Sequence, residues 1–386
     1  MQYELTEVQR GVQAKARQVA REKVAPGADQ REEQEEYPRD LVELFAREGF
    51  FSLGVPQEYG GGSLGVLAQC LMVEEVSQVC NNASAILTLV SLGAVPIKLM
   101  GSEEQKQRYL PRIARGEALS AFGLTEPGAG SDSLSMQTRA VAEGEGYVVN
   151  GQKCFISQAD VAHLLILFAR TSDGKGTRDI SAFVAELDPD KGTPGYQVVR
   201  AERKMSMRAV HTCQLALDDL RLPASAILGG EGQGFYLAMK TLDESRLPVA
   251  AQAVGIAQGA LDIAVDYARQ RVQFGSPISA FQGIQFMIAD MATQVEAARQ
   301  LTYMAAAHYD KGGSQVTMYS SMAKLLASDT AMKVATDAVQ VLGGYGFTRD
   351  FPVERLMRDA KATQLYEGTN QIQRIIIARR YMGRRG

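Results

Sequence analysis

The sequence has no tryptophan, only three histidines and four cysteines, Cys70, Cys80, Cys154 and Cys213, none of them in a C-x-x-C pair. This spacing argues against a zinc site and a disulfide framework, so we expect no metal and a reducing compartment. Three histidines leave little scope for a Ser/His/Asp triad. Neither sign of charge predominates. The net charge is −3 and the one dense basic cluster lies at the C-terminal end, so no nucleic-acid-binding surface is predicted.

A targeting segment and a membrane span are both missing from the pattern. The first ten residues, MQYELTEVQR, are polar and lack the apolar stretch of a secretory signal. The longest apolar stretch, residues 83–100, is interrupted by Ser91, Gly93 and Pro96, which predicts a buried core helix rather than a membrane span. We therefore expect a bacterial cytoplasmic protein without membrane insertion, although a mature organellar protein would look the same.

Three regimes of periodicity divide the 386 residues. Residues 1–120 are expected to be helical, with capping boxes beginning at Thr6 and Ser102. Residues 121–233 carry short apolar runs separated by Gly, Asp and Pro, which predict a small β-barrel or sandwich. Residues 234–386 return to helical spacing, with long helices and short joints that indicate an antiparallel bundle. The predicted fold class is α+β, mostly α.

Two patterns in the middle segment predict local turns. YVVNGQKCFIS (147–157) has two apolar runs around Asn150-Gly151, which predicts a β-hairpin. LALDDLRL alternates in hydrophobicity but changes register at Asp218-Asp219, which predicts a β-bulge.

A G-x-G-x-x-G pattern at Gly60, Gly62 and Gly65 imitates a dinucleotide-binding loop. Pro56 closely precedes it, and helical sequence follows for some fifty residues. Because no strand–helix–strand unit surrounds the pattern, we interpret it as a plain loop.

Three glycine-rich or aromatic segments are candidates for binding a ligand. AFGLTEPGAGSDS (121–133) offers close backbone approach and N–H donors, or is an interdomain linker. RVQFGSPI (271–278) has an Arg suited to a phosphate and a Phe suited to a ring, or is simply a helix C-terminus. VLGGYGF (341–347) is a further glycine turn, and a helix C-cap explains it equally well.

A single carboxylate, Glu367, precedes the expected N-cap Thr369 of the last helix. An acid is favoured there by the helix dipole alone. A lone carboxylate in apolar surroundings is also what a general base for a carbon-bound proton requires, because burial raises its pKa. Leu365, Tyr366 and Ile372 are the expected apolar neighbours.

Together these segments resemble the landmarks of the acyl-CoA dehydrogenase family, short- or medium-chain-like, over nearly the full length. The matching segments are VPQEYGGG, GSEEQKQRYLPRIARGE, LTEPGAGSD, NGQKCFIS, LGGEGQGF, RVQFGSPI, QVLGGYGF, FPVERLMRDAK and LYEGTNQIQR. The resemblance implies an N-terminal helical domain, a middle β-barrel and a C-terminal four-helix bundle, with FAD between barrel and bundle, usually in a homotetramer. It implies α,β-desaturation of an acyl-CoA thioester, as in fatty acid β-oxidation, with electrons passed to electron-transferring flavoprotein.

The resemblance also implies roles for particular residues, with Glu367 removing the α-proton while the β-hydrogen leaves as hydride to the flavin. The residues implied to hold FAD are Phe122, Leu124, Thr125, Gly130, Ser131, Phe155, Ile156, Ser157, Arg271, Phe274, Gln282, Gln340, Val341, Leu342, Gly343, Gly344, Thr369, Asn370 and Gln371. Those from 271 to 344 would reach the FAD of a neighbouring subunit. The residues implied to meet acyl-CoA are Ser131, Asp243, Glu244, Ser245, Arg246 and Gly368.

Two departures from the family pattern bear on the flavin. Phe155 stands where a tryptophan is common, and Ser157 where threonine is usual. Some members carry the base on the bundle helix near 243–246, but Glu244 is offset from that position, so Glu367 is favoured. Two alternatives stay open: an oxidase that uses oxygen, against which the missing long C-terminal extension argues, and a non-catalytic flavin-binding scaffold, against which Glu367 argues.

Overall fold

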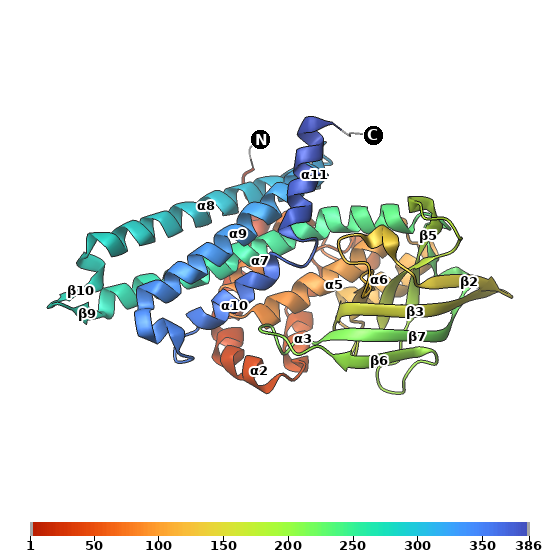
Figure 1. The fold of residues 1–386 in the computed structure, drawn as a ribbon, viewed down its shortest axis with the longest axis horizontal. Coiled ribbons are helices and arrows are strands. Elements are labelled where there is room, and N and C mark those ends of the chain that lie inside the picture. The colour runs from red at the N-terminus through yellow and green to blue at the C-terminus, as the bar shows by residue number, and fades with distance from the viewer. Residues whose placement is uncertain (1–2, 384–386) are drawn as a thin grey trace.

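The computed structural model describes residues 3–383, in which helices come first, strands follow, and helices return (Figure 1). This order confirms the predicted fold class. The first helices are α1 (Glu7–Val19), α2 (Ala28–Gln34), α3 (Arg39–Arg47), α4 (Gly65–Ser77), α5 (Asn81–Met100) and α6 (Glu103–Ala114).

Capping boxes begin two of these helices, as the sequence predicts. The side chains of Thr6 and Ser102 accept from the N–H groups of Gln9 and Gln105. Each glutamine side chain in turn accepts from the backbone N–H of its capping residue. Each box satisfies N–H groups that a helix leaves unpaired at its start. Helices α4 and α5 are apolar on nearly all faces and form the centre of this region.

The glycine pattern at 60–65 lies in a loop that leads directly into α4. The N-terminus of α4 already has an anionic partner, because the Asp310 carboxylate accepts from the N–H groups of Val66 and Leu67 at 2.7 and 3.0 Å. A Cβ on Gly65 would lie 2.6 Å from Asp310. Gly65 is therefore required by this interhelix cap, and the helix end is closed to a nucleotide phosphate.

One eight-stranded sheet forms the middle of the molecule, and its hydrogen bonds follow the open path β6-β7-β3-β2-β4-β5-β8, with β1 beside β4. The sheet has two halves, β6-β7-β3-β2 and β4-β5-β8, which are joined between β2 and β4 by one residue pair, Arg139 with Arg170. The strands are β1 (Ser120–Gly123), β2 (Arg139–Glu143), β3 (Gly146–Ser157), β4 (Leu164–Arg170), β5 (Ile180–Glu186), β6 (Tyr196–Ala201), β7 (Thr212–Pro223) and β8 (Ile227–Leu228).

Strands β4 and β5 are buried on both faces, which explains their largely apolar sequences. Leu164, Ile166 and Phe168 on one face of β4 belong to the core of the N-terminal helices. Leu165 and Leu167 on the other face pack in a core shared with β3 and β7. The two halves of the sheet therefore enclose one core between them, and the N-terminal helices pack against the other face of β4.

The predicted hairpin at Asn150-Gly151 is wrong, because β3 runs unbroken through both residues. The chain reverses earlier, between β2 and β3. Gly151 has φ +152°, and a Cβ on it would lie 2.4 Å from the Thr138 hydroxyl oxygen. The glycine therefore serves a close approach inside the sheet rather than a turn.

The predicted β-bulge at Asp218-Asp219 is confirmed. The register between β3 and β7 shifts there, with Val149 opposite Leu220 but Gly151 opposite Leu217. Asn150 fills the extra space, since its side chain donates to the Asp219 carboxylate at 2.9 Å and accepts from the Asp219 N–H at 2.8 Å. The Asn-Gly pair thus belongs to the bulge, which the sequence pattern could not distinguish from a turn.

Three long helices, α7, α8 and α9, pack side by side and carry the shorter α10 and α11 (Figure 1). A small hairpin joins α7 to α8 at the end of the molecule opposite the sheet. The elements are α7 (Gly234–Gln270), β9 (Val272–Gln273), β10 (Ser276–Pro277), α8 (Gln282–Asp310), α9 (Val316–Leu342), α10 (Val353–Thr363) and α11 (Asn370–Met382).

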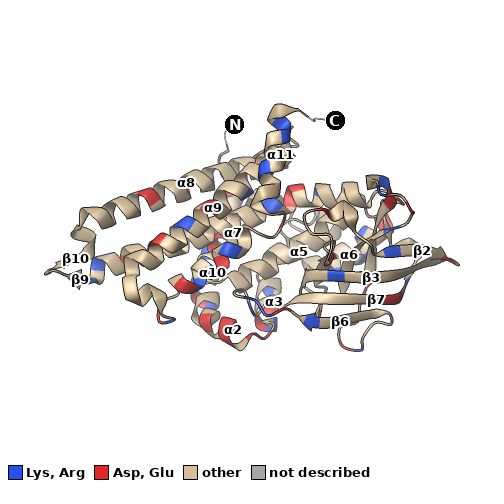
Figure 2. Cartoon of the chain, viewed as in Figure 1, with Lys and Arg blue, Asp and Glu red and all other residues tan. Residues whose placement is uncertain are grey.

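Helices α5 and α7 are long and apolar enough to cross a membrane by length and composition, yet 72% and 78% of their most apolar windows lie inside the molecule. This matches the core helix predicted at 83–100. Figure 2 shows both signs of charge interspersed along the ribbon, in agreement with a net charge of −3.

Candidate active site

Glu367 lies in a tight turn between α10 and α11. Glu367 has φ +57° and Gly368 has φ +88°, so two successive residues adopt the left-handed conformation. This conformation costs a residue with a Cβ about 1–2 kcal/mol, so the surrounding structure must hold Glu367 in it. Thr369 is the N-cap of α11, as predicted, and its hydroxyl accepts from the Ile372 N–H at 3.4 Å.

Cationic and amide side chains hold the backbone of this turn. Arg246 Nε donates to the Glu367 carbonyl at 3.3 Å, and Gln373 donates to the carbonyls of Glu367 and Gly368 at 3.1 and 2.9 Å. Lys324 Nζ donates to the Gly368 carbonyl at 2.9 Å. These bonds fix the direction in which the Glu367 side chain leaves the backbone.

The Glu367 carboxylate has one donor in the described part of the chain, the Ser245 hydroxyl, at 2.7 Å from Oε2. Burial raises the pKa of Glu367, against the opposing effects of Ser245, Arg246 and Lys324. The raised pKa agrees with the prediction, but the apolar neighbourhood does not, because Leu365 is 54% exposed and the nearest groups are polar or cationic. Glu367 is half-buried among polar and cationic groups.

The side chains of residues 243–246 on α7 have partners in two different places. Ser245 and Arg246 contact Glu367, and Arg246 also donates to Asp243 at 3.2 Å. Glu244 has other partners, since one of its oxygens accepts from Lys98 Nζ and the other from the Tyr309 hydroxyl, each at 2.6 Å. Glu244 is therefore not beside the Glu367 carboxylate.

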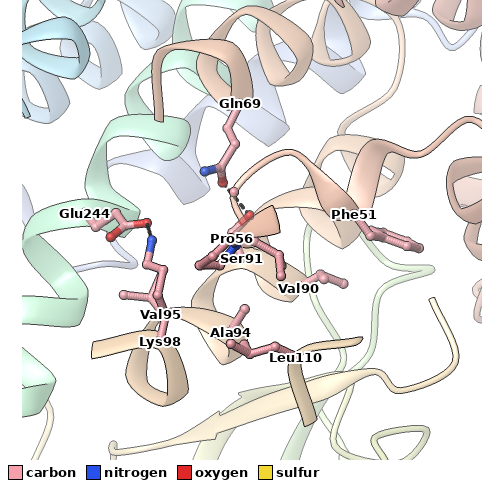
Figure 3. A pocket seen from close by; sticks show the side chains of 12 residues that line it. Phe51, Pro56, Gln69, Val90, Ser91, Ala94, Val95, Lys98, Leu110 and Glu244 are labelled. Carbon is pink, nitrogen blue, oxygen red and sulfur yellow. Dashed lines mark hydrogen bonds and ion pairs between the residues drawn. The ribbon is translucent and has the colours of Figure 1, made fainter. Parts of the chain in front are cut away.

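A cavity lies on the Glu244 side of α7 (Figure 3). The Lys98–Glu244 ion pair and a hydrogen bond from Ser91 to Gln69 at 2.7 Å are part of its wall, so the polar groups satisfy one another. The remaining wall is mostly apolar. The lining residues are Phe51, Gly54, Val55, Pro56, Gln69, Val90, Ser91, Ala94, Val95, Lys98, Leu110 and Glu244.

The first set of residues predicted to hold FAD lies at the C-terminal ends of β1 and β3 and on the loop after β1. Cys154 on β3 donates from its N–H to the Thr125 carbonyl at 3.0 Å, which brings β3 beside the loop after β1. Phe155 has φ +58° and is 65% exposed, so its ring stands out from the sheet, whereas Ile156 is buried and offers only its backbone. Of the remaining members, Phe122 lies on β1, Gly130 and Ser131 lie on the loop after β1, and Ser157 is the last residue of β3.

This region suits a flat ligand with polar atoms around its rim. The N–H groups of Leu124 and Thr125 donate to no atom of the described residues, although Leu124 is almost fully buried. Buried N–H groups normally have a partner, so this pair is available to an acceptor from outside the chain. An exposed aromatic ring beside free N–H donors fits an isoalloxazine.

The second set lies at the opposite end of the molecule (Figure 1). Arg271 follows α7, Phe274 is 96% exposed at the tip of the β9–β10 hairpin, and Gln282 begins α8. One subunit therefore does not bring the two sets together. The remaining members are Gln340, Gly343 and Gly344, which are exposed, and Val341 and Leu342, whose side chains are buried in the bundle.

The third set begins α11. Asn370 is buried, and its side chain accepts from Lys324 and donates to Ser328 and Asp329. Gln371 is exposed and Thr369 half-buried. Asn370 and Thr369 both use their side chains in hydrogen bonds within the protein, whereas Gln371 is exposed.

Three family models match almost the whole chain. The acyl-CoA dehydrogenase N-terminal domain matches residues 6–117, the middle domain 121–220 and the C-terminal domain 232–382. The chain belongs to the acyl-CoA dehydrogenase family. It is therefore an FAD-dependent oxidoreductase that acts on a CH–CH bond of an acyl-CoA.

Particular relatives are similar over almost their whole length. The chain is 49% identical to cyclohex-1-ene-1-carbonyl-CoA dehydrogenase of Geobacter metallireducens, covering 97% of this chain and 98% of the relative. It is 44% identical to the short-chain-specific acyl-CoA dehydrogenase of Clostridium acetobutylicum, covering 98% and 99%. Butyryl-CoA dehydrogenase from Megasphaera elsdenii superimposes with a TM-score of 0.95 at 41% identity, covering 99% and 100%.

A further solved structure, described as the electron-transferring flavoprotein of Acidaminococcus fermentans, contains a chain with a TM-score of 0.96 at 46% identity, with complete coverage of both chains.

Several residues that shape the site were missed at the sequence level. Lys324 is fully buried on α9, and Lys153 is fully buried on β3. A lysine in an apolar stretch is a usable signal, because a buried ammonium needs a partner. Its partner could not be identified without the fold. Gln252 gave no signal, although it accepts a hydrogen bond from Tyr366.

Proposed function

We propose that Glu367 is the catalytic base that removes the α-proton of an acyl-CoA thioester. The observation that carries this proposal is the half-buried carboxylate itself: one oxygen accepts a hydrogen bond from Ser245, and the other has no cationic contact among the described residues. A carboxylate with a raised pKa and a free oxygen can accept a proton at neutral pH. Its rigid left-handed turn fixes where that oxygen lies.

In this proposal the backbone N–H of Glu367 donates a hydrogen bond to the substrate carbonyl. This N–H donates to no atom of the described residues. A donor at that carbonyl acidifies the adjacent carbon and stabilises enolate character as it develops. When bound, FAD supplies the acceptor for the β-hydrogen as hydride. Gly368 and Arg246 complete the wall around the thioester, and Asp243 and Ser131 are proposed contacts to the CoA portion.

The substrate is proposed to carry a short or cyclic acyl group, and the reaction to serve fatty acid β-oxidation or the breakdown of a cyclic acid. This follows from relatives described as short-chain-specific, butyryl-CoA and cyclohex-1-ene-1-carbonyl-CoA dehydrogenases. Electron-transferring flavoprotein is the proposed acceptor, and the cytoplasm of a bacterium the proposed location. The domains are proposed as residues 1–120, 121–233 and 234–386.

A homotetramer is proposed because the predicted FAD residues occupy opposite ends of one subunit. Phe274 and Phe347 are 96% and 89% exposed near the bundle tip, which is unusual for phenylalanine in a monomer. A neighbouring subunit that places Arg271, Phe274 and Gln282 beside the loop 122–131 would complete the cofactor site and cover these rings.

The test is anaerobic reduction of the bound flavin. Short, branched and cyclic acyl-CoAs should bleach the yellow protein, and Glu367→Gln should keep FAD and acyl-CoA binding while bleaching at least about 100-fold more slowly. Bleaching of this variant at the wild-type rate would remove Glu367 from the mechanism. Rapid hydrogen peroxide formation during turnover in air would favour the oxidase alternative.

A further inference from the structure

A buried ion pair lies directly behind the loop proposed to hold the flavin. Lys153 on β3 has no exposed surface, and its Nζ donates to Glu126 Oε1 at 2.9 Å and to the Leu124 carbonyl at 3.2 Å. A buried ammonium is costly unless its charge and its donors are satisfied. Both of its acceptors belong to the three-residue stretch Leu124–Glu126.

Glu126 is tied down on its other side. Its carboxylate also accepts from the N–H groups of Gln137 and Thr138, at 2.5 and 3.0 Å. Burial raises the pKa of Glu126, but Lys153 and these donors outweigh it, and the net shift is downward. Glu126 is therefore held as a carboxylate that joins the loop to β3 and to the two residues before β2.

The pair has a direct consequence for the Leu124–Thr125 peptide. The carbonyl of this peptide accepts from the Lys153 ammonium, and its N–H, on Thr125, points to no acceptor in the described residues. A cation at the carbonyl oxygen polarises the peptide and makes its N–H a stronger donor. The adjacent bond from the Cys154 N–H to the Thr125 carbonyl keeps the peptide in register with Phe155.

We infer that Lys153, paired with Glu126, is a positioning residue for FAD that orients and polarises the Leu124–Thr125 peptide toward the flavin ring. Neither side chain reaches the cofactor surface, since both are buried behind the loop. The inference rests on the proposed placement of FAD at residues 122–131 and is independent of the role of Glu367.

The experiment is titration of FAD into apoprotein, followed by flavin fluorescence. Lys153→Met keeps the length of the side chain and removes its donors, and should weaken FAD binding by about tenfold or more, since a hydrogen bond to a charged group is lost at the loop. The absorption spectrum of the bound flavin should shift as well. The double variant Lys153→Met/Glu126→Gln removes the uncompensated carboxylate, so it should regain thermal stability while FAD binding stays weak.

The matched control is Glu74→Gln. Glu74 is likewise buried and paired, with Arg299 at 2.8 Å and Tyr303 at 2.7 Å, but it joins α4 to α8 away from the loop. This variant should lose stability and retain the wild-type affinity for FAD.

Two results would overturn the inference: wild-type FAD affinity in the folded double variant, or equal weakening of FAD binding by Glu74→Gln. Because the titration uses no substrate, it is separable from the bleaching test. A wild-type protein that binds FAD but is not bleached by acyl-CoA would remove the proposed function and leave this inference standing.

Discussion

Two glutamates close to α7 face opposite situations: Glu244, which is buried on the helix, and Glu367, which is half-buried in the turn before α11. Glu244 accepts from Lys98 on one oxygen and from Tyr309 on the other, so neither oxygen is free. Glu367 accepts from Ser245 alone, and its second oxygen has no donor in the described residues. The number of donors, rather than the residue type, separates an acid that joins helices from an acid that can take up a proton.

The largest expected effect separates these two acids kinetically. Glu367→Gln should slow anaerobic bleaching by acyl-CoA by about 100-fold to 10,000-fold, because an amide cannot accept the proton. Glu244→Gln should change the limiting bleaching rate by less than about tenfold, because its oxygens are already used by Lys98 and Tyr309. Stopped-flow absorbance of the flavin measures both. Equal losses in the two variants would show that Glu244 also touches the reacting atoms.

The second prediction concerns the stability of the same two variants. The pKa of Glu367 is raised in the folded state, so its contribution to stability is present below its unfolded pKa and is lost as pH rises through the folded pKa. Glu367→Gln should therefore unfold at the same or a higher temperature than wild type at pH 7 to 8. Glu244→Gln weakens a buried ion pair and should lose about 1–3 kcal/mol of unfolding free energy.

Calorimetry of the two apoproteins at pH 5 and pH 8 measures this contrast. The advantage of Glu367→Gln over wild type should be smaller at pH 5, where the acid is closer to its neutral form. A variant at Glu367 that is less stable than wild type at both pH values would mean that the carboxylate stabilises the fold, contrary to the comparison.

The contrast also shows how far sequence reasoning reaches. The helix–sheet–helix order, both capping boxes and the bulge at 218–219 could be predicted, because each depends on contacts close in sequence or on hydrophobic period. The hairpin at Asn150-Gly151 could not, because the same dipeptide serves a bulge when a partner strand approaches. Local pattern does not reveal which strand lies opposite.

The same limit holds at the site. Glu367 and the N-cap Thr369 could be identified within one segment. The different fates of Ser245 and Glu244 depend on α5, α8 and the turn before α11, which are remote in sequence. The pairing of Lys153 with Glu126 likewise spans a strand and a loop. Partners of buried charges require the fold.

A third, smaller effect is expected at Ser245. Its hydroxyl lowers the pKa of Glu367 against the larger effect of burial. Ser245→Ala should therefore move the pKa of Glu367 further up, displace the rise of the bleaching rate to higher pH, and slow the reaction at neutral pH by about tenfold. The rate in the alkaline limit should recover toward wild type. A uniform loss at all pH values would assign Ser245 to substrate binding instead.

The smallest expected effect concerns Tyr366, which donates from its hydroxyl to Gln252, itself bonded to Ser84 at 2.9 Å. This chain of hydrogen bonds holds the residue before the base. Tyr366→Phe should leave FAD content unchanged and slow limiting bleaching by only a few-fold, about 2–5, because Arg246 and Gln373 still hold the Glu367 carbonyl.

Tyr303→Phe is the matched control for this effect, since Tyr303 donates to Glu74 in the bundle core and should cost stability without changing the bleaching rate. A loss above about 100-fold in Tyr366→Phe, the lower bound expected of a general base, would place its hydroxyl among the reacting groups rather than behind the base. Identical kinetics in both tyrosine variants would mean that the two backbone contacts alone position Glu367, and the contrast with Glu244 would then depend on the carboxylate oxygens only.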